Sequence, residues 1–346
     1  MKMKLLAAAI AATACGTSAF AAEIYNGEGS TISLGGYVDV GIGEYDSSEE
    51  IEVHSVSPRI NIAGTQELPN DITVDAKGEW QLNYLDGGEE SFTTRLGYIG
   101  VTHDQMGRLV VGTQWTPYYD VAGVADLPIA FANNFLYDDH NNLGTARGKD
   151  MVSYRKAFDI PDLGTFNLGL GWQGKHSDAT EEPSKGDGVV TVTRSTKEYE
   201  SRGQIALQAD VYGFGLGYTY TGGDVTGTSK VDAHSHAISF KSGSYGDGLY
   251  SAVVYAMNEN MNGPEESDQF EILLAYSLGN GVNLSVNYEA EIDSKNELTQ
   301  FSQSALQAEY NFSPNLVGFA GYQFDLGNDL DLDEEDFWTF GARYFL

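Results

Sequence analysis

The chain has 346 residues, a formal net charge of −31 at pH 7 and a single cysteine. This excess of carboxylates excludes a nucleic-acid binder, because phosphate contacts are made by Lys and Arg. High net charge with modest hydrophobicity also occurs in disordered chains. However, 12% aromatic residues, 21 tyrosines, 41 glycines and only 8 prolines are typical of long paired strands joined by many turns.

The first 21 residues have the form of a secretory signal. Two lysines precede an apolar run too short to span a bilayer, and the tripeptide ending at Ala21 offers small residues to a signal peptidase. We expect a signal peptide over 1–21 and one mature domain over 22–346. An alternative uses Cys15 as a lipoprotein acceptor, although no leucine lies three positions before it. Cleavage after Ala21 would remove the cysteine and with it all disulfide and thiol chemistry.

The clearest strand signal is a period-two alternation over residues 72–84. Apolar or small residues such as Ile72 and Trp80 occupy the even positions, while polar residues such as Asp75 and Glu79 occupy the odd ones. A soluble sandwich also alternates, but its strands are usually about 5–6 residues long. This segment therefore favours a tilted membrane strand with one face toward lipid.

Similar segments continue to the end of the chain, which favours an all-β, transmembrane antiparallel β-barrel. A closed single-chain barrel has an even number of strands, and sixteen are expected here. Because alternation is weak in residues 235–242 and 249–258, the strand count is predicted only to within two. The predicted strands are 31–44, 55–66, 72–84, 92–102, 107–114, 151–158, 165–173, 202–211, 214–221, 235–242, 249–258, 269–278, 282–289, 302–310, 316–324 and 337–346.

The predicted connections alternate in length, as they do in outer-membrane barrels. Short turns join the strands at one end, and longer acidic connections such as 44–54, 174–200, 222–233 and 325–336 join them at the other. If the short turns face the periplasm, the acidic loops face outward.

One connection is out of scale, since about 36 residues between Gln114 and Met151 have little strand character. A loop this long inside a compact barrel is usually functional. We expect it to fold into the lumen, bury its apolar residues against the wall and narrow the channel. An external flap is the alternative.

Several motifs occur in a characteristic order. They are Ala22-Glu23-Ile24-Tyr25-Asn26, Arg59-Ile60 with Gly64, Arg95-Leu96-Gly97-Tyr98-Ile99-Gly100, Val111-Gly112-Thr113-Gln114 before 119–126, and Arg147 with Ser153-Tyr154-Arg155. In order and spacing they resemble the general trimeric porins of Gram-negative bacteria over essentially the whole mature chain. The resemblance implies a third loop that folds into the barrel and lines a constriction with carboxylates, opposite a ladder of basic side chains.

The resemblance also implies site residues. Arg59, Arg95 and Arg147 match the basic ladder, and Asp126, with Asp120 earlier in the same motif, gives the loop carboxylates. Arg59 and Arg95 fall on the polar faces of their strands. They could instead serve only to satisfy loop carboxylates and backbone carbonyls.

Two positions depart from the family pattern. A lysine common in the first strand is replaced by Tyr37, and a common loop glutamate is replaced by Ala130. Asp138 or Asp139 could replace the missing carboxylate. The constriction would then have lost one charge of each sign.

The last strand carries Trp338, Phe340, Tyr344 and Leu346 on one face, as expected of a membrane strand. By the resemblance, Tyr344 and Leu346 form the signal read by the outer-membrane assembly machinery, with Leu346 in place of the usual terminal Phe.

No motif predicts a cofactor or a catalytic metal. Asp329, Asp331 and Asp333 have the early spacing of a calcium loop, but Glu334 stands where that loop needs glycine. We expect an outer loop near lipopolysaccharide that binds divalent ions weakly. No nucleophile elbow, phosphate loop or zinc motif occurs.

The function expected is an outer-membrane channel for small hydrophilic solutes and ions, without chemistry. Acidic surfaces raise the local cation concentration, so mild cation selectivity is predicted. One alternative is an oligosaccharide-specific channel with Trp115, Tyr118 and Tyr119 as an aromatic track; another is a barrel enzyme. The resemblance implies a homotrimer, although the second loop, 85–91, is short.

Overall fold

The computed structural model describes residues 21–45, 50–85, 91–131, 135–186, 189–261, 263–332 and 335–346. The expected signal peptide, most of the second loop, Asp333 and Glu334 lie outside this part of the chain. Among the described residues, no helix is long and apolar enough to cross a membrane.

The described residues form twenty strands and three short helices. The first half contains β1 (Ala22–Gly27), β2 (Ser30–Glu44), β3 (Glu52–His54), β4 (Arg59–Leu68), β5 (Ile72–Leu82), β6 (Phe92–His103), β7 (Gly107–Trp115), α2 (Pro117–Ala122), η1 (Phe135–Tyr137), α3 (His140–Leu143), β8 (Arg147–Ile160) and β9 (Gly164–Gln173). The second half contains β10 (His176–Gly186), β11 (Val189–Tyr199), β12 (Arg202–Val211), β13 (Phe214–Thr226), β14 (Lys230–Ser244), β15 (Asp247–Glu259), β16 (Glu266–Ser277), β17 (Val282–Asp293), β18 (Leu298–Ser313), β19 (Leu316–Asp325) and β20 (Phe337–Phe345).

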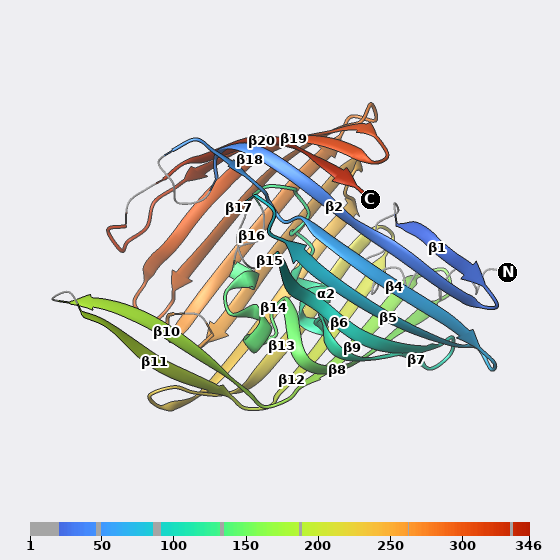
Figure 1. Cartoon of the computed structure of the whole chain (residues 1–346), viewed down its shortest axis with the longest axis horizontal. Coiled ribbons are helices and arrows are strands. Elements are labelled where there is room, and N and C mark those ends of the chain that lie inside the picture. Colours follow the sequence, from blue (N-terminus) through green and yellow to red (C-terminus); the bar gives the residue numbers. More distant parts are fainter. Residues whose placement is uncertain are drawn as a thin grey trace.

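These strands close into the predicted sixteen-stranded antiparallel barrel (Figure 1). Closure comes from β20, which pairs with β2 from Phe345 opposite Tyr37 to Trp338 opposite Glu44. β1 pairs with the earlier part of β2 and so continues the line of β20. Likewise, β3 and β4 are two parts of one barrel strand beside β2. β9 pairs directly with β12, and the hairpin of β10 and β11 lies outside the ring, so the twenty strands make sixteen barrel strands. The fold class predicted from alternation is confirmed.

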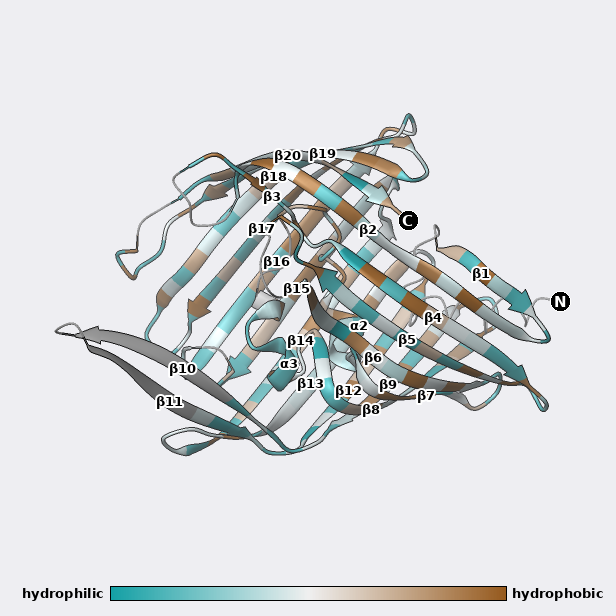
Figure 2. Cartoon of the chain, in the orientation of Figure 1, coloured by the Kyte–Doolittle hydropathy of each residue, from teal (hydrophilic) through white to brown (hydrophobic). Residues whose placement is uncertain are grey.

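The two faces of the wall follow the sequence alternation. In β5 the odd-numbered Asp75, Lys77 and Glu79 are buried. In β2 the apolar Val40 and Ile42 are exposed on the outside. Figure 2 shows hydrophobic and hydrophilic residues alternating as bands along β2 and β4. A barrel with a polar inner face and an apolar outer face suits a bilayer, because every backbone group is satisfied within the wall.

The barrel extends farther at its loop end than the alternation predicted. The expected loop 174–200 is a hairpin of β10 and β11 that projects from the barrel (Figure 1), and most of 222–233 belongs to β13 and β14. These loop predictions were wrong because strands that extend beyond the bilayer need no apolar face toward lipid, and they can form a ladder without alternation. The ends of β11, β13 and β14 instead bury Tyr199, Val225 and Ala233 together with Leu143 of α3.

The weak alternation of β14 and β15 has a different cause. Their inward positions are small and apolar, with Ala237, Ala252 and Val254 fully buried. The same is true of Leu273 in β16. These residues form an apolar patch on the inner wall, which is covered by the long connection between β7 and β8. Tertiary contact inside the barrel therefore removes the polar face that a water-lined strand would show.

Candidate pore constriction

The connection between β7 and β8 begins with a helix whose start is fixed locally. The Thr116 side chain accepts a hydrogen bond of 3.1 Å from the Tyr119 backbone N–H, and Pro117 occupies the first helical turn. Both features are typical of helix N-termini. The short α2 that results buries Tyr118, Val121 and Ala122.

This connection, here called the constriction loop (residues 116–146), lies inside the barrel. Tyr118, Ala122, Ala125, Leu136 and Ala146 of the loop pack against the apolar patch of β14–β16. Figure 1 shows its helices within the ring of strands. The lumenal loop predicted from sequence is confirmed, and the external flap is wrong. Burying these side chains contributes about 1.5–3 kcal/mol for each large one.

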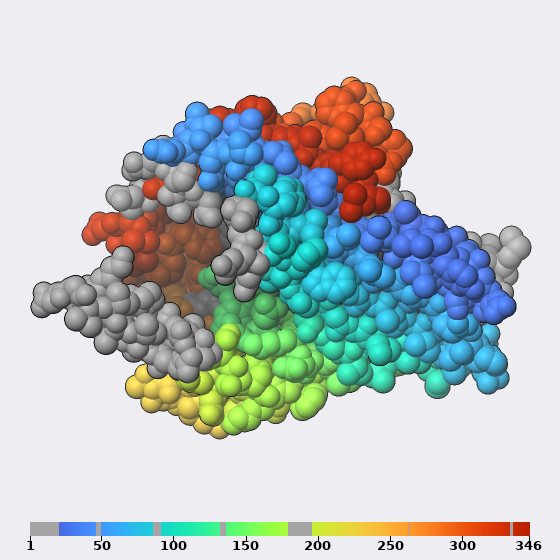
Figure 3. All heavy atoms as spheres, viewed as in Figure 1, coloured from blue at the N-terminus to red at the C-terminus, as the bar shows by residue number. Residues whose placement is uncertain are grey.

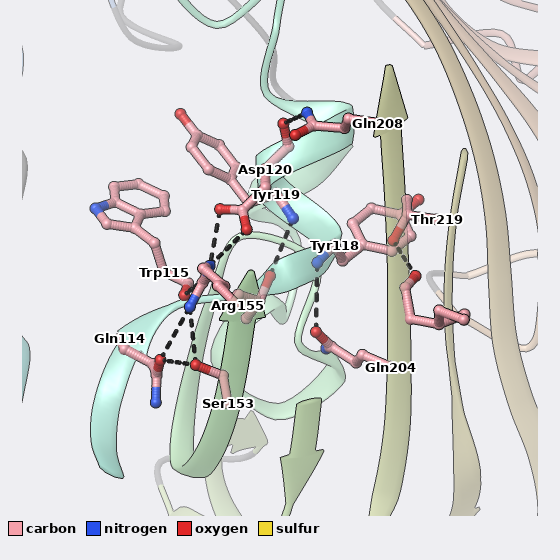
Figure 4. A network of polar contacts seen from close by, with 12 residues as sticks. Gln114, Trp115, Tyr118, Tyr119, Asp120, Ser153, Arg155, Gln204, Gln208 and Thr219 are labelled. Carbon is pink, nitrogen blue, oxygen red and sulfur yellow. Dashed lines mark hydrogen bonds and ion pairs between the residues drawn. The ribbon is translucent and has the colours of Figure 1, made fainter. Parts of the chain in front are cut away.

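Polar contacts attach the first turn of the loop to the wall (Figure 4). The Arg155 guanidinium of β8 donates to Asp120 at 2.6 Å and to the Trp115 carbonyl at 2.8 Å. Gln208 of β12 donates to the Asp120 backbone carbonyl. Asp120 is therefore paired with the wall, although its side chain remains partly exposed. Burial raises the pKa of this carboxyl, and Arg155 opposes the shift.

Farther along, the loop is attached to the opposite part of the wall. The Tyr250 hydroxyl donates to the Val124 carbonyl at 2.6 Å. The Gln307 side chain of β18 accepts from the Phe131 backbone N–H at 3.1 Å, and Glu309 accepts from the Ile129 N–H at 3.0 Å. The loop thus crosses from β12 to β18 before it returns.

The returning part of the loop is held by side chains of β12. Arg202 donates to the Leu143 carbonyl and Gln204 donates to the Gly144 carbonyl, each at 2.7 Å. Both carbonyls lie at the C-terminal end of α3, where backbone acceptors lack intrahelical partners. Attachment at its start, middle and end fixes the loop across the lumen, and we infer that the passage lies beside β4–β7.

The wall across that passage is basic and is organised by one carboxylate. Glu79 of β5 lies 3.1 Å from Lys77, 3.1 Å from Arg95 of β6 and 3.8 Å from Arg59 of β4. Arg59 and Arg95, predicted to belong to the ladder, therefore do meet. One carboxylate faces three cations, so this cluster carries a net positive charge toward the passage.

Tyr37 is part of the same wall. Its ring lies between two guanidinium groups, with Arg343 at 4.0 Å and Arg59 at 4.8 Å from the ring centroid. Arg343 of β20 also donates to Asp39 at 3.0 and 2.8 Å. A cation–π contact of this kind contributes roughly 0.5–2 kcal/mol. At this position an aromatic ring stacks two arginines, whereas a lysine would repel them.

On the loop side, Asp126 is held by two tyrosines. It accepts a hydrogen bond from the Tyr119 hydroxyl at 2.6 Å and another from Tyr137. Burial raises the pKa of the Asp126 carboxyl, although both hydrogen bonds and the charges of Arg59 and Arg95 act in the opposite direction. The predicted loop carboxylate therefore faces the basic wall with its oxygens already engaged by hydroxyl groups.

Arg147, the third predicted ladder residue, stands apart from the cluster around Glu79. Its guanidinium lies 2.9 Å from His140 and 5.8 Å from the centre of the Trp115 ring. Among the described residues it forms no ion pair with a carboxylate. Two of the three ladder arginines are thus joined through Glu79, and the third is held by aromatic rings.

The remaining predicted carboxylates lie on the return of the loop. Asp139 accepts hydrogen bonds from Asn142 and Tyr199, each at 2.5 Å, which ties it to the projecting hairpin. Asp138 is exposed, and partial desolvation together with the neighbouring Asp139 raises its pKa. Neither has an ion pair to the ladder among the described residues.

Sequence reasoning missed several residues of this site. Arg155, Arg343, His140 and Tyr137 were not predicted, although the inward parity of Arg155 and Arg343 could have indicated them. The proposed aromatic track fails at Tyr118, which is buried with its hydroxyl 2.7 Å from Ser235. Within the described residues, no group of three or more His, Cys, Asp or Glu could hold a metal ion.

Comparison with known proteins decides the family. Residues 7–224, more than half of the chain, match the model of the Gram-negative porin family. The chain belongs to the Gram-negative porin family. It is 24% identical to outer membrane porin N of Escherichia coli, over 97% of this chain and 94% of that protein. It is 25% identical to outer membrane porin F of Salmonella typhi, with the same coverage of both chains.

Solved structures agree on the fold. An OmpF structure from Salmonella typhi, in complex with daunomycin, superposes with a TM-score of 0.73 at 17% identity, covering 94% of this chain and all of that one. An anion-selective porin from Comamonas acidovorans gives 0.67 at 13% identity, covering 92% of this chain and all of the other. This porin is therefore a β-barrel of the outer membrane, a channel through which small hydrophilic solutes diffuse passively.

Proposed function

We propose that diffusion through this porin is controlled at the constriction loop, with the basic wall of β4–β6 on one side and the loop on the other. The observation that carries the proposal is the attachment of the loop across the lumen, from Gln208 on β12 to Gln307 on β18. Figure 3 shows the barrel hollowed at the end where the longer connections lie. Solutes that enter there must pass the narrowed zone.

Ion preference is proposed to be mildly cationic. The formal net charge of −31 makes the approaches to the channel negative, which concentrates cations. Arg59, Lys77, Arg95 and Arg147 oppose this effect locally, and the first three of these cations surround the carboxylate of Glu79. The preference should therefore be weak rather than absolute.

The proposed route is tested by swelling of proteoliposomes in isotonic solutions of sugars of increasing size. Permeation that falls smoothly with solute size would support a diffusive channel. Permeation of one oligosaccharide far above smaller sugars would favour the substrate-specific alternative. A clear anion preference in the zero-current potential would contradict the cation part alone.

We also propose that three copies associate through the outer surfaces of β2, β4, β6 and β20. Val40, Ile62, Ile99 and Phe340 on these strands are exposed and apolar, as an interface within a membrane requires. Heat-sensitive migration on a denaturing gel and conductance that closes in three equal steps would support the trimer. Single-step closure would contradict it.

Export and assembly are proposed to use the two ends of the chain. Residues 1–21 would be removed during export, which N-terminal sequencing of the purified porin tests. Tyr344 is exposed on the outside of β20, and the Leu346 backbone N–H donates to Gly36 at 3.0 Å. These last residues would be read by the assembly machinery, while the acidic outer loops lie near lipopolysaccharide.

A further inference from the structure

The two hydrogen-bond partners of the His140 ring determine its protonation state. Its Nδ1 lies 2.7 Å from the Tyr137 backbone carbonyl and its Nε2 lies 2.9 Å from an Nη of Arg147. A carbonyl oxygen only accepts and a guanidinium only donates. The Nδ1 atom must therefore carry the hydrogen, and Nε2 must supply a lone pair. Only the neutral imidazole, in one tautomer, makes both contacts.

We propose that His140 is a positioning residue that sets where Arg147, a ladder arginine, stands in the constriction. Arg147 needs such a partner, because its Nε is buried without a hydrogen-bond partner and no described carboxylate pairs with it. Its other contact is the Trp115 ring. The proposal rests on the proposed function, since it assigns the residue that fixes one charge of the same site.

The contact between His140 and Arg147 is one link in a ring of side-chain contacts along the constriction loop. Trp115 stacks on Tyr119 with the ring centroids 4.2 Å apart, Tyr119 and Tyr137 both donate to Asp126, and Tyr137 meets the His140 ring edge-on. His140 then returns the chain of contacts to Arg147. The loop carboxylate and the ladder arginine are thus joined through side chains rather than by direct contact.

The charged and titratable groups around His140 come from four elements and from the segment before α3. Arg147 and Lys149 lie on β8, Arg95 on β6, Asp178 on β10, Tyr137 on η1, and Asp138 and Asp139 immediately before α3. A polar cavity of about 380 Å³ adjoins the ring and includes Lys149 and Asp178. The cavity is large enough for water and has polar side chains around it, so solvent can exchange protons with the ring.

A fall in pH should therefore release Arg147 from His140. Burial lowers the pKa of His140 to about 4, and the charges of Arg147 and Arg95 act in the same direction. Once protonated, Nε2 can no longer accept, and the imidazolium repels Arg147. The contribution of neutral His140 is complete above its ordinary value of 6.5 and is lost as the pH falls through about 4.

The first test measures the K⁺/Cl⁻ permeability ratio in planar bilayers at pH 7 for the full mature porin and its variants. His140→Ala should shift the ratio toward that of Arg147→Ala. His140→Gln, whose amide oxygen can accept from Arg147, should keep the wild-type ratio. In an Arg147→Ala background, His140→Ala should add nothing. A wild-type ratio in His140→Ala, or a shift that persists without Arg147, would overturn the proposal.

The second test follows the ratio from pH 7 to pH 3. Wild type should show a step in the ratio near pH 4, above the common background from carboxylates, as His140 gains a charge and releases Arg147, and His140→Gln should lack it. His236→Gln, on the outer face of β14, should retain it as the matched control. An identical step in His140→Gln would overturn the proposal. A protein with no conductance at all would instead refute the proposed function, so the two failures are distinguishable.

Discussion

Two buried glutamates of the inner wall have opposite surroundings. Glu79 is 4% exposed and is surrounded by Arg59, Lys77 and Arg95. Glu271 of β16 is fully buried, both of its carboxylate oxygens lack a partner among the described residues, and it pairs in register with Glu289 of β17. The first carboxylate stabilises its neighbours, and the second is opposed by a like charge.

The same substitution should therefore have opposite effects at these two positions. Glu79→Gln leaves three cations without their carboxylate and should cost roughly 3–5 kcal/mol of unfolding free energy. Glu271→Gln relieves a like-charge pair and should be neutral or stabilising by about 1 kcal/mol. Urea unfolding in detergent, followed by tryptophan fluorescence, measures both. Equal destabilisation by the two variants would contradict this assignment.

The raised pKa of Asp126 predicts how loop attachment depends on pH. A carboxyl whose pKa is higher in the folded state than its ordinary 3.8 stabilises fully below that value. This stabilisation is lost as the pH rises through the folded-state pKa. After division by the intrinsic exchange rate at each pH, hydrogen exchange of the loop amides should therefore accelerate over that interval in wild type and not in Asp126→Asn. A parallel pH dependence in the variant would show that another group is responsible.

At the scale of elements, the constriction loop depends on wall side chains that bond its backbone. Gln307 accepts from the Phe131 N–H at 3.1 Å and the Ala130 N–H at 3.3 Å, and it also donates to the Phe131 carbonyl. These backbone groups are remote from β18 in sequence. No pattern in the loop itself could have indicated which strand would hold it.

Removing this attachment should loosen the middle of the loop. Gln307→Leu leaves backbone donors unpaired at roughly 1–3 kcal/mol each, so single-channel recordings should show more current noise and a larger mean conductance. Gln303→Leu, on the same strand, is the control, because within the described part of the chain the Gln303 side chain hydrogen-bonds to the side chains of Glu289 and Gln323 and not to the loop. Indistinguishable traces from both variants would refute the attachment.

Strand β2 contains a glycine that its pairing requires. Gly36 has a φ of +126°, and a Cβ there would lie 2.1 Å from the Arg59 backbone oxygen. Gly36→Ala must displace the strand that carries Arg59, so we expect poor refolding and a loss of heat-modifiable mobility on gels. Gly203→Ala should refold normally, because no atom lies within 4 Å of the position that its added methyl group would occupy. Normal refolding of Gly36→Ala would contradict this argument.

For the whole molecule, alternation alone predicted the class of fold and sixteen strands, because lipid outside and water inside impose opposite polarity on successive residues. Alternation did not predict the strands correctly where lipid and water do not lie on opposite faces. This is the case in the hairpin of β10 and β11 and on the inner face of β14 and β15. The ladder residues Arg59 and Arg95 could be placed by parity. The link from Arg147 to His140 could not, since it depends on how the loop returns across the lumen.

The most direct test of the account is single-channel recording of the purified porin in planar bilayers with a series of sugars. We expect stable conductance that rises in proportion to salt concentration and is reduced only by sugars small enough to enter, without saturation. Two results would contradict an open diffusion channel bounded by the constriction loop. One is the absence of any conductance, and the other is a saturating block by one oligosaccharide.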